Sequence, residues 1–360
     1  MVKRLKLENF RGVKKGEIEL GDLTILVGSN NSAKTTILEA LFLLPNPFRS
    51  VPYMIPAPTL STNSPDVSQK TLSIELTSAS LVHEMHKTLN SQGYIFLFYK
   101  YLAEEATIGW DDDNYLKFVK SGRTIYATSN IPSFKGAHIP MPKGDIDSFG
   151  WLYLSDARCE EFAETQGKLL TPESLLISSE FTEFSYWYMN NNWANIFNLG
   201  IAKEVAKDIS RMVNENFVNI TIEPFLGGNL SIFGFLEDGS RVRLGDLGSG
   251  AQIYIVSRML YELKKPKLLL WDDIEAHLNP RMLVRIGEWF SELIEDGVQV
   301  VVSTHSLEAV RILAELNKNA VICLTSIDDG ILKERKMSIE EVDNLQSAGV
   351  DVRLADKMII

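Results

Sequence analysis

The sequence has little of what would tie it to a specialised class of protein. Its 360 residues include only two cysteines, Cys159 and Cys323, too few for a disulfide framework, and neither lies at metal-ligand spacing from another cysteine or a histidine. Its 13 prolines and 23 glycines are too few for a disordered or collagen-like chain. No apolar run approaches the roughly 18 residues that span a bilayer. We therefore expect a folded, soluble, cytoplasmic protein with no membrane partner and with both thiols reduced.

Positive charge is also scarce. Lysine and arginine together number 36 against 47 aspartates and glutamates, and the net charge is −11. This balance argues against a chain that coats nucleic acid or an anionic membrane through bulk charge. The first fifteen residues have the opposite sign, because only Glu8 opposes the basic residues there, which are Lys3, Arg4, Lys6, Arg11, Lys14 and Lys15. This edge is either a local basic patch or an ordinary solvated face.

Internal repeats and the sustained heptads of a coiled-coil arm are absent as well. Residues 201–217 have helical spacing but are too few for such an arm. Near its two ends the chain alternates strand-like and helix-like segments, which predicts an α/β fold with a mostly parallel sheet. Residues 47–217, between these ends, contain four of the six tryptophans and no motif that we can name.

A phosphate loop is the first motif that is present. Residues 23–27 are apolar throughout, as in a strand buried within a sheet, and residues 35–44 have helical spacing that Pro45 and Pro47 end. Between them lies GSNNSAKT, in the setting where successive backbone N–H groups and a helix N-terminus cradle phosphates. The alternative is an ordinary strand-to-helix turn that contains a lysine and binds no phosphate.

Individual residues of this loop have expected roles. In phosphate-loop enzymes the lysine bridges the β- and γ-phosphates, and the hydroxyl that follows it ligates Mg²⁺. Here Lys34 and Thr35 occupy these positions. The expected nucleotide-binding residues of the loop are Gly28, Ser29, Asn30, Asn31, Ser32, Ala33, Lys34, Thr35 and Thr36.

Two carboxylates end a second buried strand. The stretch LLLWDD places Asp272 and Asp273 at the edge where a parallel sheet presents ligands. We expect Asp272 to hold Mg²⁺ through water, since this ion keeps part of its hydration shell in proteins. Asp273 is placed to act as a general base or to orient water. A solvated strand end is the alternative, and the phosphate loop upstream makes it the weaker one.

Four segments together resemble the ATPase head of the ABC class, in the branch that contains RecF, structural-maintenance-of-chromosomes (SMC) and OLD-like proteins. VKRLKLENFRGVKKGEIELGDLTILVGSNNSAKTTILEAL is similar to the N-terminal signature of that branch, and LLLWDDIEAHLNP is similar to its second nucleotide motif and dimer-interface loop. LGDLGSGAQ resembles its signature loop, and VVVSTHS resembles its switch-histidine strand. The C-terminal GVDVRLAD is typical of small single-head members.

This resemblance implies ATP and Mg²⁺ held between two copies of the chain. Ser249 and Gly250 would close over ATP bound to the second copy, with the serine hydroxyl and backbone N–H groups donating to the γ-phosphate. His305 would contact the γ-phosphate or the attacking water, and Arg11 would lie near the nucleotide.

For other histidine and polar residues the sequence supports only broader predictions. Glu275 and Asn279 lie in the interface loop and could touch the second copy, whereas His277 is expected to be structural. His83 and His86 have helical spacing but no third ligand nearby, so we expect no metal site there.

Three positions depart from the family. Ala33 stands where the family has glycine, which costs about 1–2 kcal/mol if the position is left-handed. Asp273 stands where the family generally has glutamate, and misplacing the water by about an ångström lowers a rate on the order of 10²-fold. Gly248 stands where the family usually has serine, and Ser249 comes one place later. In addition, Gln69 fits the family's Q-loop glutamine poorly. We therefore predict slow hydrolysis.

The motifs predict a P-loop NTPase of the α/β class, an ABC-type head with a mixed or parallel sheet flanked by helices and an inserted α+β lobe. Residues 1–46 and 218–360 would form the split core, and residues 47–217 would form the insertion, a lid or partner-binding lobe. We expect an ATP-dependent switch that hydrolyses ATP in a homodimer and acts on a partner, in DNA maintenance or defence. A nucleotide-gated binding module with little turnover is the alternative.

A nuclease subunit is a third hypothesis, since OLD-like relatives often have that role. The residues after 310 are too few for a Toprim nuclease domain, so cleavage would need a separate protein. DNA binding would rest on the N-terminal basic edge, and a protein bound by the insertion is the preferred partner.

Overall fold

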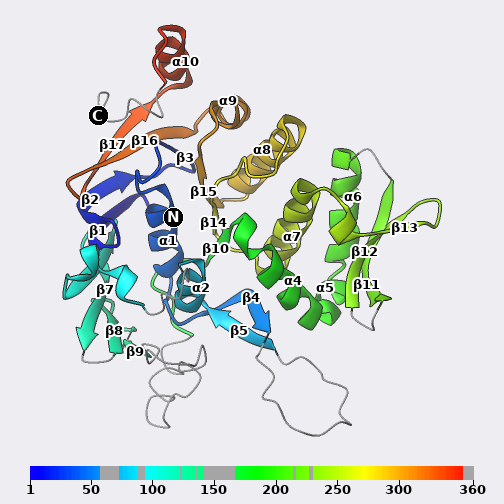
Figure 1. Ribbon diagram of the computed structural model, residues 1–360, viewed down its shortest axis with the longest axis horizontal. Helices are drawn as coiled ribbons and strands as arrows, with labels where there is room; N and C mark the ends of the chain where they lie inside the picture. Colours follow the sequence, from blue (N-terminus) through cyan, green and yellow to red (C-terminus); the bar gives the residue numbers. More distant parts are fainter. Residues whose placement is uncertain are drawn as a thin grey trace, which may run out of the picture.

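The described residues form one large mixed sheet with helices on both faces, together with two smaller sheets (Figure 1). This computed structural model describes residues 1–56, 73–86, 94–121, 124–134, 136–140, 167–213, 216–226 and 230–351. The α/β class and the flanked mixed sheet predicted from the sequence are confirmed. Gln69, Trp151 and Cys159 lie outside the described residues. Within the described part of the chain, no helix has both the length and the apolar character needed to cross a membrane.

Five neighbouring strands are parallel, and three of them lead into the predicted motifs. The five are β10 (Ser174–Ile177), β14 (Leu268–Trp271), β15 (Gln299–Thr304), β3 (Leu23–Val27) and β16 (Val321–Asp328), in that order across the sheet. Every residue of β3, β14 and β15 is buried. Burial on both faces explains why their sequences are apolar runs without alternation.

Helices α1 (Lys34–Leu43), α8 (Pro280–Glu295) and α9 (Leu307–Leu316) cover these strands. From β3 the chain proceeds through α1 toward β10, whereas α8 leads from β14 to β15 and α9 leads from β15 to β16. Because crossovers are right-handed, opposite directions put α1 on one face and α8 and α9 on the other (Figure 1). The direction of travel reverses between β3 and β15, which is where open α/β sheets bind ligands.

The other half of the sheet is mainly antiparallel. It continues from β16 through seven more strands: β17 (Ile331–Met337), β2 (Val13–Glu19), β1 (Arg4–Phe10), β6 (Glu105–Trp110), β7 (Asn114–Ser121), β8 (Thr124–Ser129) and β9 (Ala137–Pro140). Strands β6–β9 and β10 come from the predicted insertion, residues 47–217, yet they belong to the same sheet as the core. The boundaries drawn from the sequence therefore do not separate two sheets, and the division into domains stays a prediction.

A second group of elements lies beside the parallel strands (Figure 1). Helices α4 (Thr182–Asn191), α5 (Trp193–Asn198) and α6 (Ile201–Val213) precede the antiparallel sheet β11 (Phe217–Pro224), β12 (Leu230–Leu236) and β13 (Arg241–Arg243), and α7 (Ser249–Lys264) follows it. The helix predicted over residues 201–217 therefore ends at Val213, and its last predicted residue begins a strand. Helix α6 packs against both β11 and α7.

A hairpin and two α-helices lie outside these groups. A hairpin of β4 (Ser50–Pro56) and β5 (Ser73–Thr77) leads into α2 (Ser78–Met85), which contacts α1. The last described helix is α10 (Ile339–Ser347), which contacts α9.

Gln299 fastens the first residues of the chain to the centre of the sheet. Its side chain is buried at the start of β15, where it accepts a hydrogen bond from Val2 N (3.0 Å) and donates to Val2 O (2.7 Å) and Gly21 O (3.0 Å). One amide thus satisfies three backbone groups that lie nearly 300 positions away in sequence.

We predict that Gln299→Leu lowers the free energy of unfolding by about 2–4 kcal/mol, because these backbone groups lose their partners in a buried place. Chemical denaturation measures the change. The control is Gln346→Leu on the exposed side of α10, which should lower it by less than about 1 kcal/mol. Equal losses for the two variants would contradict this account of Gln299.

Candidate nucleotide site

The phosphate loop leaves β3 at Gly28 and enters α1 at Lys34. A Cβ at Gly28 would lie 2.5 Å from Thr325 O and 2.6 Å from Ser32 Oγ, so this position admits only glycine. At the other end of the loop Ala33 is left-handed, with φ 73° and ψ 9°. The backbone at Ala33 is therefore of the kind in which a side chain costs about 1–2 kcal/mol.

Lys34 is folded over the loop. Its Nζ donates to Gly28 O (3.1 Å), Ser29 O (2.9 Å) and Ser32 Oγ (3.3 Å), and the residue is only 6% exposed. A buried ammonium held by neutral oxygens favours an anion beside it. This arrangement suits a phosphate group within the loop.

Asp272 links the phosphate-loop helix to two strands. Its carboxylate accepts from Thr35 Oγ1 (3.0 Å) and from Ser303 Oγ (2.5 Å), which is the side chain of the next-to-last residue of β15. Burial raises the pKa of Asp272 above its usual range, and the charge of Asp273 raises it further. The hydrogen bonds from Ser303 and Thr35 and the charge of Lys34 lower it.

The residues around Asp272 fit Mg²⁺. A hydroxyl and a carboxylate that already touch each other supply the hard oxygen ligands that Mg²⁺ prefers, and this ion commonly takes only one or two protein ligands beside phosphate and water. A cation there would also compensate a carboxylate whose charge burial disfavours. Thr35 and Asp272 are thus the residues that would hold the ion.

Asp273 and His305 lie on the solvent side of Asp272. Asp273 is left-handed (φ 47°), and its side chain is 53% exposed, whereas Asp272 is 8% exposed. His305 Nε2 is 3.8 Å from Asp273 Oδ1. One carboxylate is therefore buried beside Thr35, and the other is open to solvent beside His305.

Ser303 was not anticipated from the sequence. Its hydroxyl donates to Asp272 and accepts from the backbone N–H of Asp273 (2.8 Å), so one side chain positions both carboxylates. The only signal was its place within VVVSTHS, just before the histidine.

Arg11 occupies a buried polar cluster beside this site. It forms an ion pair with Glu39 on α1, and its Nη2 lies 3.4 Å from His86 Nδ1. Burial lowers the pKa of Arg11 to about 10, against the opposing effect of the Asp272 charge. The expected place of Arg11 near the nucleotide stays a prediction.

His86 is neutral in this cluster. Burial lowers its pKa to about 3, and the charge of Arg11 contributes. Because Arg11 can only donate and the Glu39 carboxylate can only accept, the proton of His86 lies on Nε2, which donates to Glu39 Oε1 (2.6 Å). Glu39 was not anticipated, since a carboxylate within an apolar helix gives no sign of its partner.

The signature loop lies at the start of α7. This helix begins at Ser249, with Gly248 as its N-cap. Ser249 is exposed, whereas Gly250 is buried so closely against the interface loop that a Cβ there would lie 2.6 Å from His277 O. The structure thus joins the signature helix to the loop that follows the two carboxylates.

The interface loop makes its own internal contacts. Asn279 is the N-cap of α8 and accepts from Met282 N (3.0 Å). Glu275 accepts from Thr304 Oγ1 and from the backbone N–H of His305, each at 2.6 Å. Asn279 and Glu275 thus have hydrogen-bond partners within their own chain. The sequence alone suggested only that these two residues could contact a second copy.

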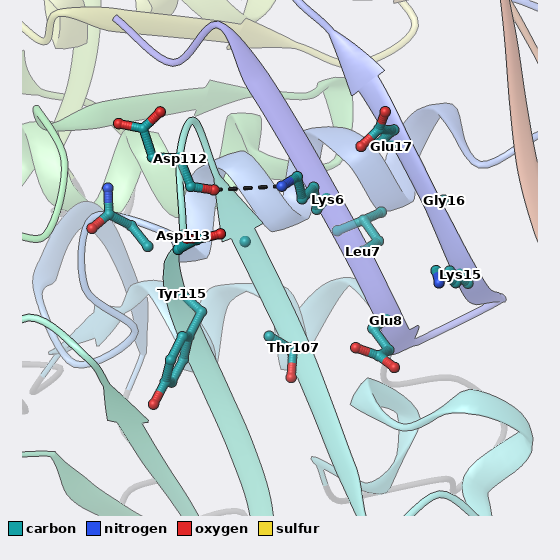
Figure 2. A pocket seen from close by; sticks show the side chains of 12 residues that line it. Lys6, Leu7, Glu8, Lys15, Gly16, Glu17, Thr107, Asp112, Asp113 and Tyr115 are labelled. Carbon is teal, nitrogen blue, oxygen red and sulfur yellow. Dashed lines mark hydrogen bonds between the residues drawn. The ribbon is translucent and has the colours of Figure 1, made fainter.

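The N-terminal basic edge is balanced by acids. Figure 2 shows Lys6 and Lys15 in a surface pocket of about 330 Å³ with Glu8 and Glu17 beside them. Lys6 Nζ donates to Asp112 O (3.4 Å) in the turn between β6 and β7. Alternating charges make this surface a poor match for the uniform negative charge of a nucleic-acid backbone.

Two family models match separate parts of the chain. Residues 1–138 match the family described as "AAA ATPase domain", and residues 178–311 match "AAA domain, putative AbiEii toxin, Type IV TA system". The Old nuclease of Escherichia phage P2 is 24% identical over 95% of this chain. The chain spans 62% of the length of that relative. The DNA double-strand break repair Rad50 ATPase of Methanopyrus kandleri is 47% identical over 58 residues, which are 15% of this chain and 7% of the relative.

Solved structures agree on the fold. An Smc head domain with coiled coil and joint from Pyrococcus yayanosii has a TM-score of 0.54 at 10% identity, covering 97% of this chain and 99% of its own. An Smc head domain from Pyrococcus furiosus, bound to the C-terminal domain of ScpA, has a TM-score of 0.51 at 13% identity, covering 96% and 98%. The phosphate loop, the paired carboxylates, the two matching ATPase domain families and these likenesses agree in supporting an ATPase head similar to those of the ABC class, in the branch of RecF, SMC and OLD-like proteins.

Proposed function

We propose that the chain binds ATP with Mg²⁺ and hydrolyses it slowly as a homodimer, and that this cycle drives a conformational change in a partner. The observation that carries the proposal is the hydrogen-bonded unit formed by Thr35, Asp272 and Ser303, with Lys34 on one side and Asp273 on the other. This unit lies where β3, β15 and β14 end side by side.

Each residue of the unit has a distinct task. Lys34 leaves its loop oxygens for the β- and γ-phosphates, while Thr35 and Asp272 hold the ion. Mg²⁺, when bound, neutralises charge that develops on the phosphate oxygens. Asp273 orients the attacking water and accepts its proton, and His305 contacts the γ-phosphate or that water.

Two features support slow turnover. The carboxylate of Asp273 is one methylene shorter than the family's glutamate, so it reaches less far toward the water. Ala33 adds a left-handed residue with a side chain to the phosphate loop. A nucleotide-gated binding module, in which ATP acts as a dimerising ligand with little turnover, remains the alternative function on the same observations.

The signature helix supports the dimer. Its first residue, Ser249, is exposed and does not serve as the helix cap, which is Gly248. In the proposed assembly Ser249 and the N–H groups after it donate to the γ-phosphate held by the other copy. Contact between His277 and Gly250 within each copy would then connect the carboxylate loop to the start of that helix.

The partner is proposed to be a protein that binds residues 47–217, in DNA maintenance or defence. The Old nuclease and Rad50 relatives support that setting. Tyr101 and Leu102 support a protein surface, because they are 62% and 78% exposed and lie within this range. The mixed charge around Lys6 and Lys15 gives direct DNA binding less support.

Phosphate release tests hydrolysis. We expect the wild-type chain to release phosphate from ATP faster than Lys34→Ala, which lacks the charge that binds the β- and γ-phosphates. Asp273→Glu should raise the rate by roughly tenfold or more, because the longer side chain restores reach toward the water. ATP binding with release no faster than that of Lys34→Ala would favour the binding module over the enzyme.

The metal site makes a prediction about pH. In Asp272→Asn the melting temperature without nucleotide should rise at pH 7, because the variant removes a carboxylate whose charge burial disfavours. A raised pKa means that the wild-type chain gains stability as pH falls, so the difference should shrink toward about pH 4. The rise in melting temperature that Mg²⁺ and ATP cause in the wild-type chain should be lost in Asp272→Asn. Scanning calorimetry with and without the ligands measures both, and an unchanged ligand effect would contradict the assignment.

Gel filtration tests the dimer. With ATP and Mg²⁺ the wild-type chain should elute as a dimer, and Ser249→Arg should remain a monomer while binding ATP with a dissociation constant within about threefold of wild type. The matched control is Asn344→Arg, which adds the same charge on the exposed side of α10 and should still dimerise. Dimers of Ser249→Arg would exclude this interface.

A further inference from the structure

Glu275 is a carboxylate without a role in the proposed chemistry. It lies two residues after Asp273 in the interface loop and is partly buried. One oxygen accepts the hydroxyl of Thr304 at 2.6 Å, and the other accepts the backbone N–H of His305 at 2.6 Å. Both oxygens are therefore turned toward the end of β15.

These two bonds belong to a longer set of hydrogen bonds, here called the clasp, which joins the loop after β14 to the last residues of β15 and to His305. The backbone N–H of Ile274 donates to Ser303 O (3.0 Å), and that of Asp273 donates to Ser303 Oγ (2.8 Å). Consecutive residues after β14 thus contact consecutive residues at the end of β15 and directly after it. Glu275 is the last residue of the loop to take part in the clasp, and it accepts the backbone N–H of His305.

The clasp extends to α9. Thr304 Oγ1, which donates to Glu275, accepts from the backbone N–H of Ser306 (2.9 Å). Ser306 is the N-cap of α9 and accepts from Ala309 N (3.2 Å). The turn that carries His305 is therefore fixed on one side by a helix cap and on the other by Glu275.

Removing the Glu275 carboxylate would remove the hydrogen bonds on only one side of the turn that carries His305. The helix cap would remain, but the His305 N–H and the Thr304 hydroxyl would lose a charged acceptor, and hydrogen bonds to charged groups are the stronger kind. The turn could then rotate about its link to α9. The 3.8 Å separation between His305 Nε2 and Asp273 Oδ1 depends on that turn.

We propose that Glu275 is a positioning residue for hydrolysis, which holds His305 beside Asp273 through the backbone of the turn. This inference rests on the proposed function and adds a residue that touches neither nucleotide nor water. It also gives the carboxylate a task within its own chain, in place of contacts with the second copy.

Single-turnover hydrolysis of ATP by the 360-residue chain tests the proposal, with ATP affinity measured in parallel. Glu275→Ala should lower the rate by on the order of tenfold to a hundredfold, because small displacements of catalytic groups have effects of that size. The dissociation constant for ATP should stay within about threefold of wild type. Glu275→Gln keeps an acceptor for the His305 N–H and should retain most of the rate.

A double-mutant cycle separates positioning from general damage. If Glu275 acts through the histidine, Glu275→Ala should cause no further loss in a His305→Ala background. The matched control is Glu295→Ala, which removes an exposed carboxylate at the opposite end of α8 and should leave the rate unchanged. Multiplied losses in the double variant would overturn the proposal.

Amide hydrogen exchange tests the contact without reference to turnover. Exchange at His305 should be faster in Glu275→Ala than in wild type or Glu275→Gln, and equal exchange in all three would overturn the proposal. A failure of the proposed hydrolysis can be distinguished from a failure of the proposed role of Glu275. Wild-type release no faster than that of Lys34→Ala refutes the proposed hydrolysis, whereas normal wild-type release with an unaffected Glu275→Ala refutes only the role of Glu275.

Discussion

A buried carboxylate between the phosphate-loop helix and two strand ends governs the architecture of this site. Asp272 lies where the phosphate-loop helix, β14 and β15 meet, and burial disfavours its charge. Hydrogen bonds from Thr35 and Ser303 and the nearby charge of Lys34 compensate in part. A cation would relieve the remaining deficit, so affinity for the metal and the cost of burying this carboxylate have the same origin.

The sequence was informative wherever chemistry depends on neighbours along the chain. The strand, loop and helix around Lys34 were foreseen, because a phosphate loop is built from consecutive backbone N–H groups. The paired carboxylates were foreseen because an apolar run that ends in two acids is typical of a buried strand that presents ligands at the edge of its sheet. The cost at Ala33 followed from glycine's conformational freedom, and the structure has that residue left-handed.

Contacts between distant segments could not be foreseen in the same way. Nothing near Glu39 indicates that it pairs with Arg11, and nothing near Glu275 indicates that it accepts from His305. The strands β6–β9 and β10 were assigned to an insertion because strand pairing depends on register with partners elsewhere in the chain. The helix expected through Phe217 ended early, since β12 offers that residue a place in a sheet.

The phosphate loop is completed by residues synthesised long after it. Gly28 packs against Thr325 O, and β3 has β15 on one side and β16 on the other. At the usual speed of translation, roughly 15 to 60 seconds pass between these two positions. During that time an apolar strand with two open edges leaves the ribosome without its neighbours, and such a segment is prone to pair with other chains. A nascent chain therefore completes its nucleotide site only after β16 has been made.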